Sequence, residues 1–162
     1  MPLERSKLHS FIVDSSPDGI LVTDPNGKVV FANAAAETML GYDVGETVGM
    51  HVEEFIPPGS RSHHEANREA YHQTPTPRPM GLGLELQALT STGNLLPVEI
   101  SLSPLPDSGD GWVVAILRDV TERRELRNLG AATLAAAERE RTRIAQELHD
   151  DVLQRLAAML LS

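Results

Sequence analysis

The chain has 162 residues with 14 Lys and Arg against 23 Asp and Glu, and it contains no cysteine. This length suits one domain with an additional segment, and 41% hydrophobic residues exclude a wholly disordered chain. The net charge of −9 argues against direct nucleic-acid binding, and the absence of cysteine excludes disulfides and thiolate metal sites. No apolar run reaches the roughly 20 residues of a membrane span, so we expect a cytoplasmic protein. We also expect no metal site.

Charge and turn-forming residues divide the chain in two. Residues 1–117 hold 6 basic and 15 acidic side chains, whereas residues 118–162 hold 8 of each. All 11 prolines and 11 of the 12 glycines also precede residue 118. This pattern predicts a loop-rich domain followed by a long helix. The predicted boundaries are an N-terminal helix within 1–17, a folded domain over 18–120 and a helical segment over 121–162.

The first half of the domain predicts two strands and a capped helix. An amphipathic helix around Leu8 to Ile12 should end before Pro17. Strands over 19–23 and 28–32 are joined by a turn, since Asp-Pro-Asn-Gly favours one. Asn33 can cap a helix over 34–40, and Gly41 can end it in a left-handed conformation.

The second half predicts a helix and three more strands. The helix covers residues 61–73, and the prolines at 75, 77 and 79 predict a stiff, extended connector. Alternating apolar residues predict strands over 82–87 and 98–102, and a more uniformly apolar strand covers 112–117. Two strands, then helices, then three strands predict an α+β domain with a five-stranded antiparallel sheet.

Three segments of this domain closely resemble a PAS domain, over roughly residues 5–122. They are DGILVTDPNGKVVFANAAAETMLGY, GNLLPVEISLSPL and WVVAILRDVTERR. The resemblance implies a sensor domain that holds a ligand, or its own side chains, between the sheet and the short helices. The lack of cysteine excludes photosensors that bind their chromophore through a cysteine.

The helical segment carries an apolar stripe at steps of three and four residues, as in a coiled coil. Its members are Leu126, Leu129, Thr133, Ala136, Ile144, Leu148, Val152 and Leu156. Such a stripe cannot be buried against its own helix, so we expect a homodimer through this segment.

Within the stripe, ERERTRIAQELHDDVLQRLAAML resembles the phosphoacceptor box of sensor histidine kinases that act on NarL/LuxR-type response regulators. The resemblance implies that His149 accepts phosphate, that Asp150 orients its ring or takes its proton, and that Gln154 positions water for dephosphorylation of the regulator. Asp119 and Thr121, where the last strand meets the helix, would couple the sensor to this histidine. The alternative, that His149 is an ordinary surface residue, is disfavoured because the whole surrounding segment matches the phosphoacceptor box.

The 162 residues contain no ATP-binding domain and no second phosphoacceptor helix. We therefore expect a truncated kinase that is inactive alone and that meets ATP and Mg²⁺ only through a further domain. The alternative is a stand-alone PAS dimerisation module with a vestigial histidine. Sequence beyond residue 162 would distinguish the two.

The segment RSHHEANREAYHQTPTPRPMG resembles part of the haem-PAS oxygen sensors. The resemblance places His64 at their axial-ligand position, and a histidine can ligate haem iron. Leu84 stands where those sensors carry an arginine near bound oxygen. The alternative is an exposed or structural His64, with His63 and His72 at exposed helix positions. The cofactor is therefore unknown at this point, with haem as one candidate.

Overall fold

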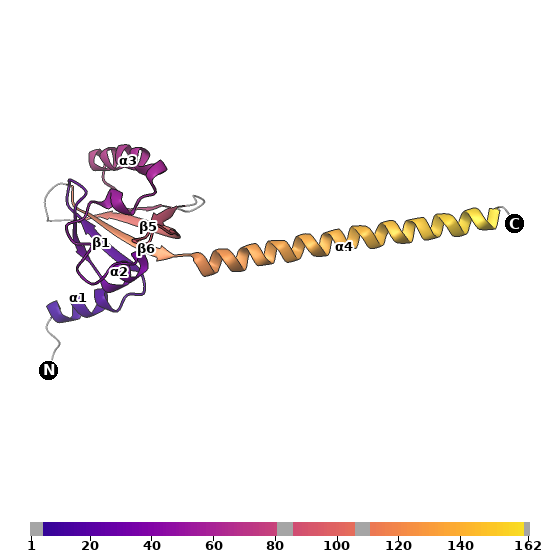
Figure 1. The fold of residues 1–162 in the computed structure, drawn as a ribbon, viewed down its shortest axis with the longest axis horizontal. Helices are drawn as coiled ribbons and strands as arrows, with labels where there is room; N and C mark the ends of the chain where they lie inside the picture. Colours follow the sequence, from indigo (N-terminus) through magenta and orange to yellow (C-terminus); the bar gives the residue numbers. More distant parts are fainter. Residues whose placement is uncertain (1–4, 81–85, 106–110, 161–162) are drawn as a thin grey trace. The chain divides into compact units, whose positions relative to one another are not determined.

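The computed structural model describes residues 5–80, 86–105 and 111–160, apart from the side chains of residues 5, 6 and 150–160. The chain divides into two compact units, Met1–Thr121 and Glu122–Ser162 (Figure 1).

The first unit is built around an antiparallel sheet. Its strands are β1 (Gly19–Thr23), β2 (Val29–Ala32), β3 (Arg78–Met80), β4 (Gln87–Leu89), β5 (Leu95–Pro104) and β6 (Val113–Asp119). The order across the sheet is β2-β1-β6-β5-β3, and β4 also pairs with β5. The long apolar strands β5 and β6 pair through seven residues each, from Val98↔Asp119 to Pro104↔Val113, and lie next to each other within the sheet. The predicted α+β fold with an antiparallel sheet is confirmed.

Short helices complete this unit. They are α1 (Arg5–Asp14), α2 (Ala34–Leu40), α3 (Arg61–Gln73) and two 3-10 helices, η1 (Val52–Phe55) and η2 (Pro58–Ser60). The predicted caps of α2 are both present. The side chain of Asn33 accepts a hydrogen bond from the Ala36 N–H, and Gly41 adopts φ 80° beyond the last turn.

The region after α3 differs from the sequence-based expectation. Part of the segment predicted as a connector is β3, in which Pro79 pairs with Ser101. Proline is tolerated there because β3 is an edge strand and lacks a further neighbour to receive an N–H. Most of the strand predicted over 82–87 lies outside the described residues, and β4 begins at Gln87. The described part of the chain thus has six strands, because two short strands pair with different parts of β5.

The core lies between the inner face of the sheet and α2. Leu21, Leu40 and Val98 are each at most 2% exposed. A Cβ built on Gly19 would lie 2.9 Å from the Ala36 Cα, so β1 and α2 approach at a distance that only glycine allows. This close packing holds the first turn of α2, and with it Asn33, against the sheet.

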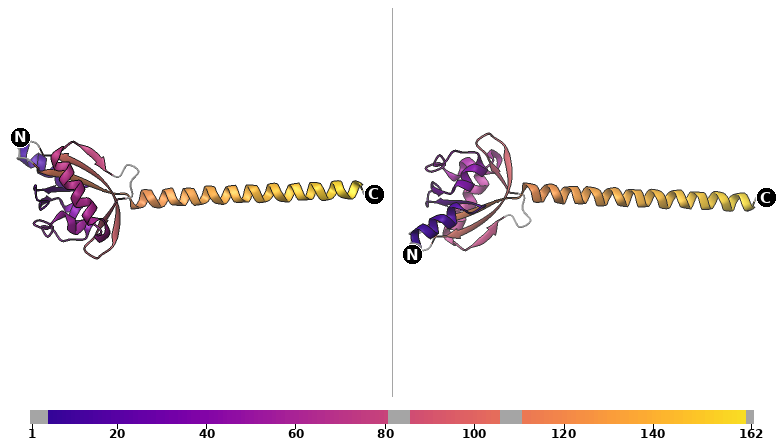
Figure 2. Two further views of the ribbon diagram at one scale, coloured as in Figure 1. Left: turned by 90° about the horizontal axis from the view of Figure 1, so that it is seen from above. Right: turned by 90° about the horizontal axis from the view of Figure 1, so that it is seen from below.

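The second unit is helix α4 (Thr121–Leu160), which continues through Gly130 without a break (Figures 1 and 2). Its large apolar side chains are uncovered in the single chain: Leu126, Leu129, Leu134, Ile144 and Leu148 are 45–74% exposed. A helix with this much exposed apolar surface needs a partner. Among the described residues, no helix combines the length and apolar character needed to cross a membrane.

Candidate functional site

His149 lies on α4 with an exposed side chain. Two turns earlier, Arg143 donates to Glu140, with Nε–Oε2 at 2.9 Å, and also contacts Glu147. These exposed pairs stabilise the helix only modestly, so their main effect is to keep this face solvated. The backbone of Asp150 and Gln154 belongs to α4, but their side chains lie outside the described part of the structure. The helix therefore presents a histidine to solvent, where a partner domain can reach it.

The two predicted coupling residues meet where β6 passes into α4. Asp119 Oδ1 accepts hydrogen bonds from the Thr121 N–H at 2.8 Å and from the Thr121 hydroxyl at 2.6 Å. This carboxylate stands at the N-terminus of α4, where it satisfies an otherwise free N–H and interacts favourably with the helix dipole. Asp119 is thus a cap for the helix that carries His149.

An ion pair lies beside this junction. Arg118 donates to both carboxylate oxygens of Asp18, at 3.0 Å and 2.7 Å. The hydrogen bond from Arg118 lowers the pKa of Asp18, with the nearby positive charge acting in the same direction and burial opposing it. The pair ties the start of β1 to the end of β6. Sequence reasoning missed it because the two residues are 100 positions apart.

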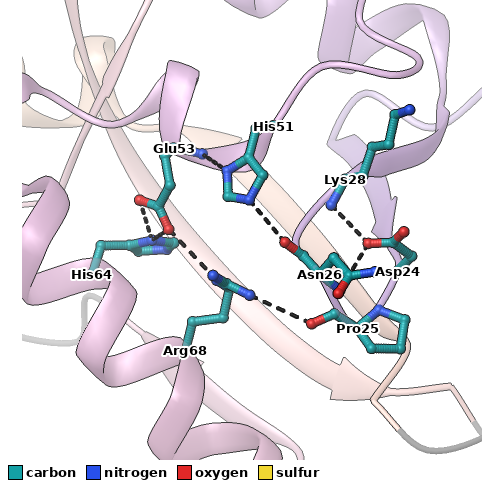
Figure 3. Close-up of polar contacts among 8 residues, drawn as sticks. All are labelled: Asp24, Pro25, Asn26, Lys28, His51, Glu53, His64 and Arg68. Atoms are coloured by element: carbon teal, nitrogen blue, oxygen red, sulfur yellow. Dashed lines mark hydrogen bonds and ion pairs between the residues drawn. The ribbon is translucent and has the colours of Figure 1, made fainter.

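His64 lies on α3 and faces η1 rather than open solvent (Figure 3). Its Nδ1 is 2.9 Å from Glu53 Oε2, and its side chain is 28% exposed. Because a carboxylate only accepts, Nδ1 carries the proton and Nε2 is left with a lone pair in the neutral ring. One turn further along α3, Arg68 Nε lies 3.5 Å from Glu53 Oε1. Glu53 therefore holds two α3 side chains at once.

The same cluster reaches the turn between β1 and β2 (Figure 3). His51, which caps η1, accepts from the Glu53 N–H and donates through Nε2 to the Asn26 carbonyl at 2.8 Å. Arg68 also donates to the Pro25 carbonyl, at 3.4 Å. These contacts fix α3 and η1 relative to the sheet.

Between α3 and the sheet lies a cavity of about 70 Å³, which we call the α3 cavity. Helix α3 contributes His64, Arg68, Tyr71 and His72 to its wall, and the sheet contributes Met80, Leu102, Val113 and Ala115. Arg78 at the start of β3 lines it too, with its guanidinium 4.8 Å from the Tyr71 ring centre. The cavity is therefore polar on its helix side and apolar on its sheet side.

Three buried polar atoms on the cavity wall have no hydrogen-bond partner within the described residues. They are Arg68 Nε, the Tyr71 hydroxyl and His72 Nδ1. Tyr71 is 4% exposed, and burial raises the pKa of its hydroxyl, although Arg78 opposes this. The expectation that His72 is an exposed helix residue was therefore wrong, because α3 turns this side chain towards the sheet. His63 is exposed, as expected.

Haem does not fit this cavity. His64 has the features of an axial ligand, since a carboxylate holds Nδ1 and leaves Nε2 available. However, a volume of about 70 Å³ is several times below the roughly 300 Å³ at which cofactor pockets begin. The position occupied by Leu84 lies outside the described residues. Haem ligation by His64 thus stays a sequence-based prediction that the cavity volume opposes.

We expect the purified chain, incubated with haem and then freed of unbound haem, to show no Soret band in its absorption spectrum. The physical reason is the small cavity, which would have to expand several-fold to admit a porphyrin. A band that disappears in the variant His64→Ala but persists in His63→Ala would contradict this expectation and establish His64 as the ligand.

Sequence reasoning found His64 but missed the cluster around it. A signal was present: His64, Arg68 and Tyr71 are spaced by four and three residues, which places them on one face of a helix. The identity of the opposing residue, Glu53, required the tertiary structure. Among the described residues, no group of three or more His, Asp or Glu side chains could hold a metal ion.

Two family models match the chain. The PAS domain model matches residues 17–122, and a histidine kinase model matches residues 140–162. The first match ends where α4 begins, and the second includes His149.

Two of the curated relatives that match the chain are sensor proteins by name. Sensor protein FixL of Bradyrhizobium diazoefficiens is 27% identical over 121 residues, covering 75% of this chain and 23% of the relative. Oxygen sensor protein DosP of Escherichia coli is 27% identical over 103 residues, covering 64% of this chain and 13% of the relative. The chain therefore spans less than a quarter of either relative.

Solved structures show the same fold. A domain of the sensory box sensor histidine kinase/response regulator from Geobacter sulfurreducens is 26% identical with a TM-score of 0.59, covering 71% of this chain and 94% of that one. The PAS domain of an HTR-like protein from Haloarcula marismortui is 24% identical with a TM-score of 0.60, covering 70% and 90% of the two chains.

Proposed function

Since the chain belongs to the PAS domain family and carries a histidine kinase segment over residues 140–162, we propose that it is the signal-sensing and phosphate-accepting portion of a two-component sensor histidine kinase. The observation that carries this proposal is the histidine kinase match around an exposed His149, on the same helix that leaves the PAS unit. The relative FixL, which is named a sensor protein, adds support for the sensing part.

The family that matches residues 140–162 is a dimerisation and phosphoacceptor domain. This match supports pairing of two chains and a response regulator as partner. The exposed leucines of α4 supply the apolar surface for such pairing. The specific partner we propose is a regulator of the NarL/LuxR type, because the sequence around His149 resembles the kinases of that class.

The proposed chemistry uses the imidazole of His149 as nucleophile. One ring nitrogen attacks the γ-phosphorus of ATP and forms a bond to it. The bond between this phosphorus and ADP breaks, and ADP leaves. Asp150, the next residue, holds the other ring nitrogen and takes up its proton. Gln154 lies one turn beyond Asp150 and would orient water when the partner regulator is dephosphorylated. ATP and Mg²⁺ would be supplied by an ATP-binding catalytic domain, which is not among these 162 residues.

The experiment that tests the proposal is phosphorylation of a longer protein, in which an ATP-binding kinase domain is joined to this chain after residue 162. With γ-labelled ATP, we expect phosphate that is labile to acid and stable to base, as a phosphohistidine is, mapped by mass spectrometry to residue 149. A chain that is folded and dimeric but never takes up phosphate would favour the stand-alone dimerisation module instead.

We further propose that Asp119 couples the PAS unit to the kinase through its cap on α4. In the longer protein, Asp119→Ala removes both hydrogen bonds to Thr121. A helix cap contributes about 1 kcal/mol. This corresponds to a roughly fivefold change in the equilibrium constant between two states of the junction. We expect the rate of autophosphorylation to change by about this factor, measured with labelled ATP at fixed protein concentration.

Asp119→Asn is the matched control for this prediction, because it keeps the accepting oxygen Oδ1. It should remain within about twofold of the parent protein. Equal rates for the parent, the alanine variant and the asparagine variant would contradict a coupling role for the cap.

The relative named an oxygen sensor raises gas sensing as a second candidate function. We do not propose it for this chain, because the α3 cavity beside His64 is too small for haem.

A further inference from the structure

The α3 cavity combines three features that the proposed kinase function leaves unused. It lies between α3 and the sheet, it has a volume of about 70 Å³, and three polar atoms of its lining residues lack a hydrogen-bond partner among the described residues, although Arg68 Nε also lies 3.5 Å from Glu53 Oε1. A buried polar group without a hydrogen bond is costly, and native proteins rarely keep three of them together. These atoms therefore indicate a missing occupant.

The unpaired atoms specify a hydrogen-bond acceptor. Arg68 Nε–H can only donate. The Tyr71 hydroxyl can also donate, and its raised pKa keeps it protonated. His72 Nδ1 donates in one of its two neutral tautomers. Arg68 precedes Tyr71 by three residues and His72 by four, so it neighbours both on the helix surface, and all three residues line the α3 cavity.

The charges around the cavity specify an anion. Arg68 and Arg78 contribute two positive charges, and Glu53, which contacts Arg68, contributes one negative charge. Of these three charges, the positive charge of Arg78, an exposed residue whose guanidinium lies over the Tyr71 ring, is not paired with a carboxylate of the cavity wall. A water molecule would satisfy hydrogen bonds but would leave this charge, whereas a monoanion would satisfy both.

The volume limits the size of the anion. At roughly 10–15 Å³ of such cavity volume per water molecule, about 70 Å³ admits a molecule of about four or five non-hydrogen atoms. The apolar sheet side, with Leu102 and Val113, can contact a methyl group or the face of a planar ion. Flat oxyanions of this size include formate, acetate and nitrate.

We propose that the α3 cavity binds a small planar oxyanion, held by Arg68, Tyr71 and His72 of α3, and that this anion is the ligand of the PAS unit. The proposal rests on the sensing role proposed above. Binding to the chain itself does not require His149 to be phosphorylated, so a failure of one proposal can be distinguished from a failure of the other.

The test is calorimetric titration of the chain with sodium formate, acetate and nitrate in separate arms, with sodium chloride at matched ionic strength as control. A ligand of about four heavy atoms binds no more tightly than about 40 µM, so the titrations extend into the millimolar range. We expect saturable binding of at least one oxyanion and none of chloride. The arms distinguish a carboxylate from an inorganic anion.

Tyr71→Phe is the decisive variant, because it removes only the unpaired hydroxyl. It should weaken binding of the oxyanion roughly tenfold. Without ligand, its Tm should equal or exceed that of the parent, because the variant no longer buries an unpaired hydroxyl. Tyr42→Phe is the matched control: Tyr42 packs against Phe55 and does not line the cavity, so binding should be unchanged.

Tyr42→Phe also provides a spectroscopic readout, because Tyr71 is then the one tyrosine left in the chain. A bound anion should raise the pKa of Tyr71 further, since it disfavours the phenolate, and this is measured by ultraviolet absorbance. Two results would overturn the proposal. One is the absence of saturable binding by any of the three oxyanions, together with a lowered Tm of Tyr71→Phe, which would indicate ordered water. The other is binding that Tyr71→Phe leaves unchanged.

Discussion

In the longer protein, His149→Gln is expected to reduce acid-labile phosphate to background while the protein stays folded and dimeric. The substitution removes the ring nitrogen that forms the bond to phosphorus, and a glutamine amide nitrogen is not nucleophilic. Because His149 is exposed on α4, the change removes no buried contact, and surface substitutions of this kind alter stability by about 0.5 kcal/mol or less. Phosphate is measured with labelled ATP, and the dimer by light scattering.

His63→Gln is the matched control for this experiment. His63 is also exposed and also lies on a helix, α3, but in the PAS unit. It should retain full phosphate incorporation. Labelling that persists in His149→Gln, or that is lost equally in His63→Gln, would contradict the assignment of His149 as the phosphoacceptor.

Local chemistry explains why the α2 region could be predicted from sequence. An Asn before an apolar helical pattern and a Gly after it are cap signals that depend on a few neighbouring residues. The Asp-Pro-Asn-Gly turn and the alternating residues of β5 are signals of the same range. These elements appear in the structure where the sequence places them.

The edge of the sheet could not be predicted in the same way. Arg78–Met80 has no strand signal of its own, since Pro79 lies at its centre, and it becomes β3 because β5 is long enough to pair with two short segments. Pairing of this kind depends on where α3 returns the chain to the sheet. Tertiary context therefore overrides local preference at this edge.

The candidate site divides along the same line. Each of the residues His149, Asp119 and Thr121 lies within a short sequence motif, and each could be assigned from that motif. The α3 cavity depends on which face of α3 meets the sheet, and on Glu53 from a different element. The helical spacing of His64, Arg68 and Tyr71 marks them as neighbours on α3, but sequence reasoning used only His64, and spacing does not identify the three as the wall of a cavity.

Asn33→Ala is the stability prediction with the largest expected effect. Asn33 is 1% exposed, and its side-chain amide makes four hydrogen bonds. Oδ1 accepts from the N–H groups of Ile20 and Ala36, and Nδ2 donates to the carbonyls of Val13 and Asp18. The alanine variant loses all four and leaves buried backbone groups unpaired. We expect a loss of about 3 kcal/mol in the free energy of unfolding.

The measurement is urea unfolding followed by the fluorescence of the single tryptophan, Trp112, which reports on the PAS unit. Asn94→Ala is the control, because Asn94 lies exposed in the turn before β5 and should cost about 0.5 kcal/mol or less. A loss at Asn33 no larger than this would show that the four bonds do not hold the unit together.

Asn33→Asp separates the two halves of the amide. It keeps the oxygen that accepts from β1 and α2, but it places a second oxygen opposite the carbonyls of Val13 and Asp18. The accepting half should survive, since a carboxylate is also favourable at the N-terminus of α2. The donating half fails, and with it the attachment of the end of α1 and of the segment that follows it. We therefore expect an intermediate loss of stability. Losses as large for Asp as for Ala would instead place most of the stabilisation in the two bonds from Nδ2.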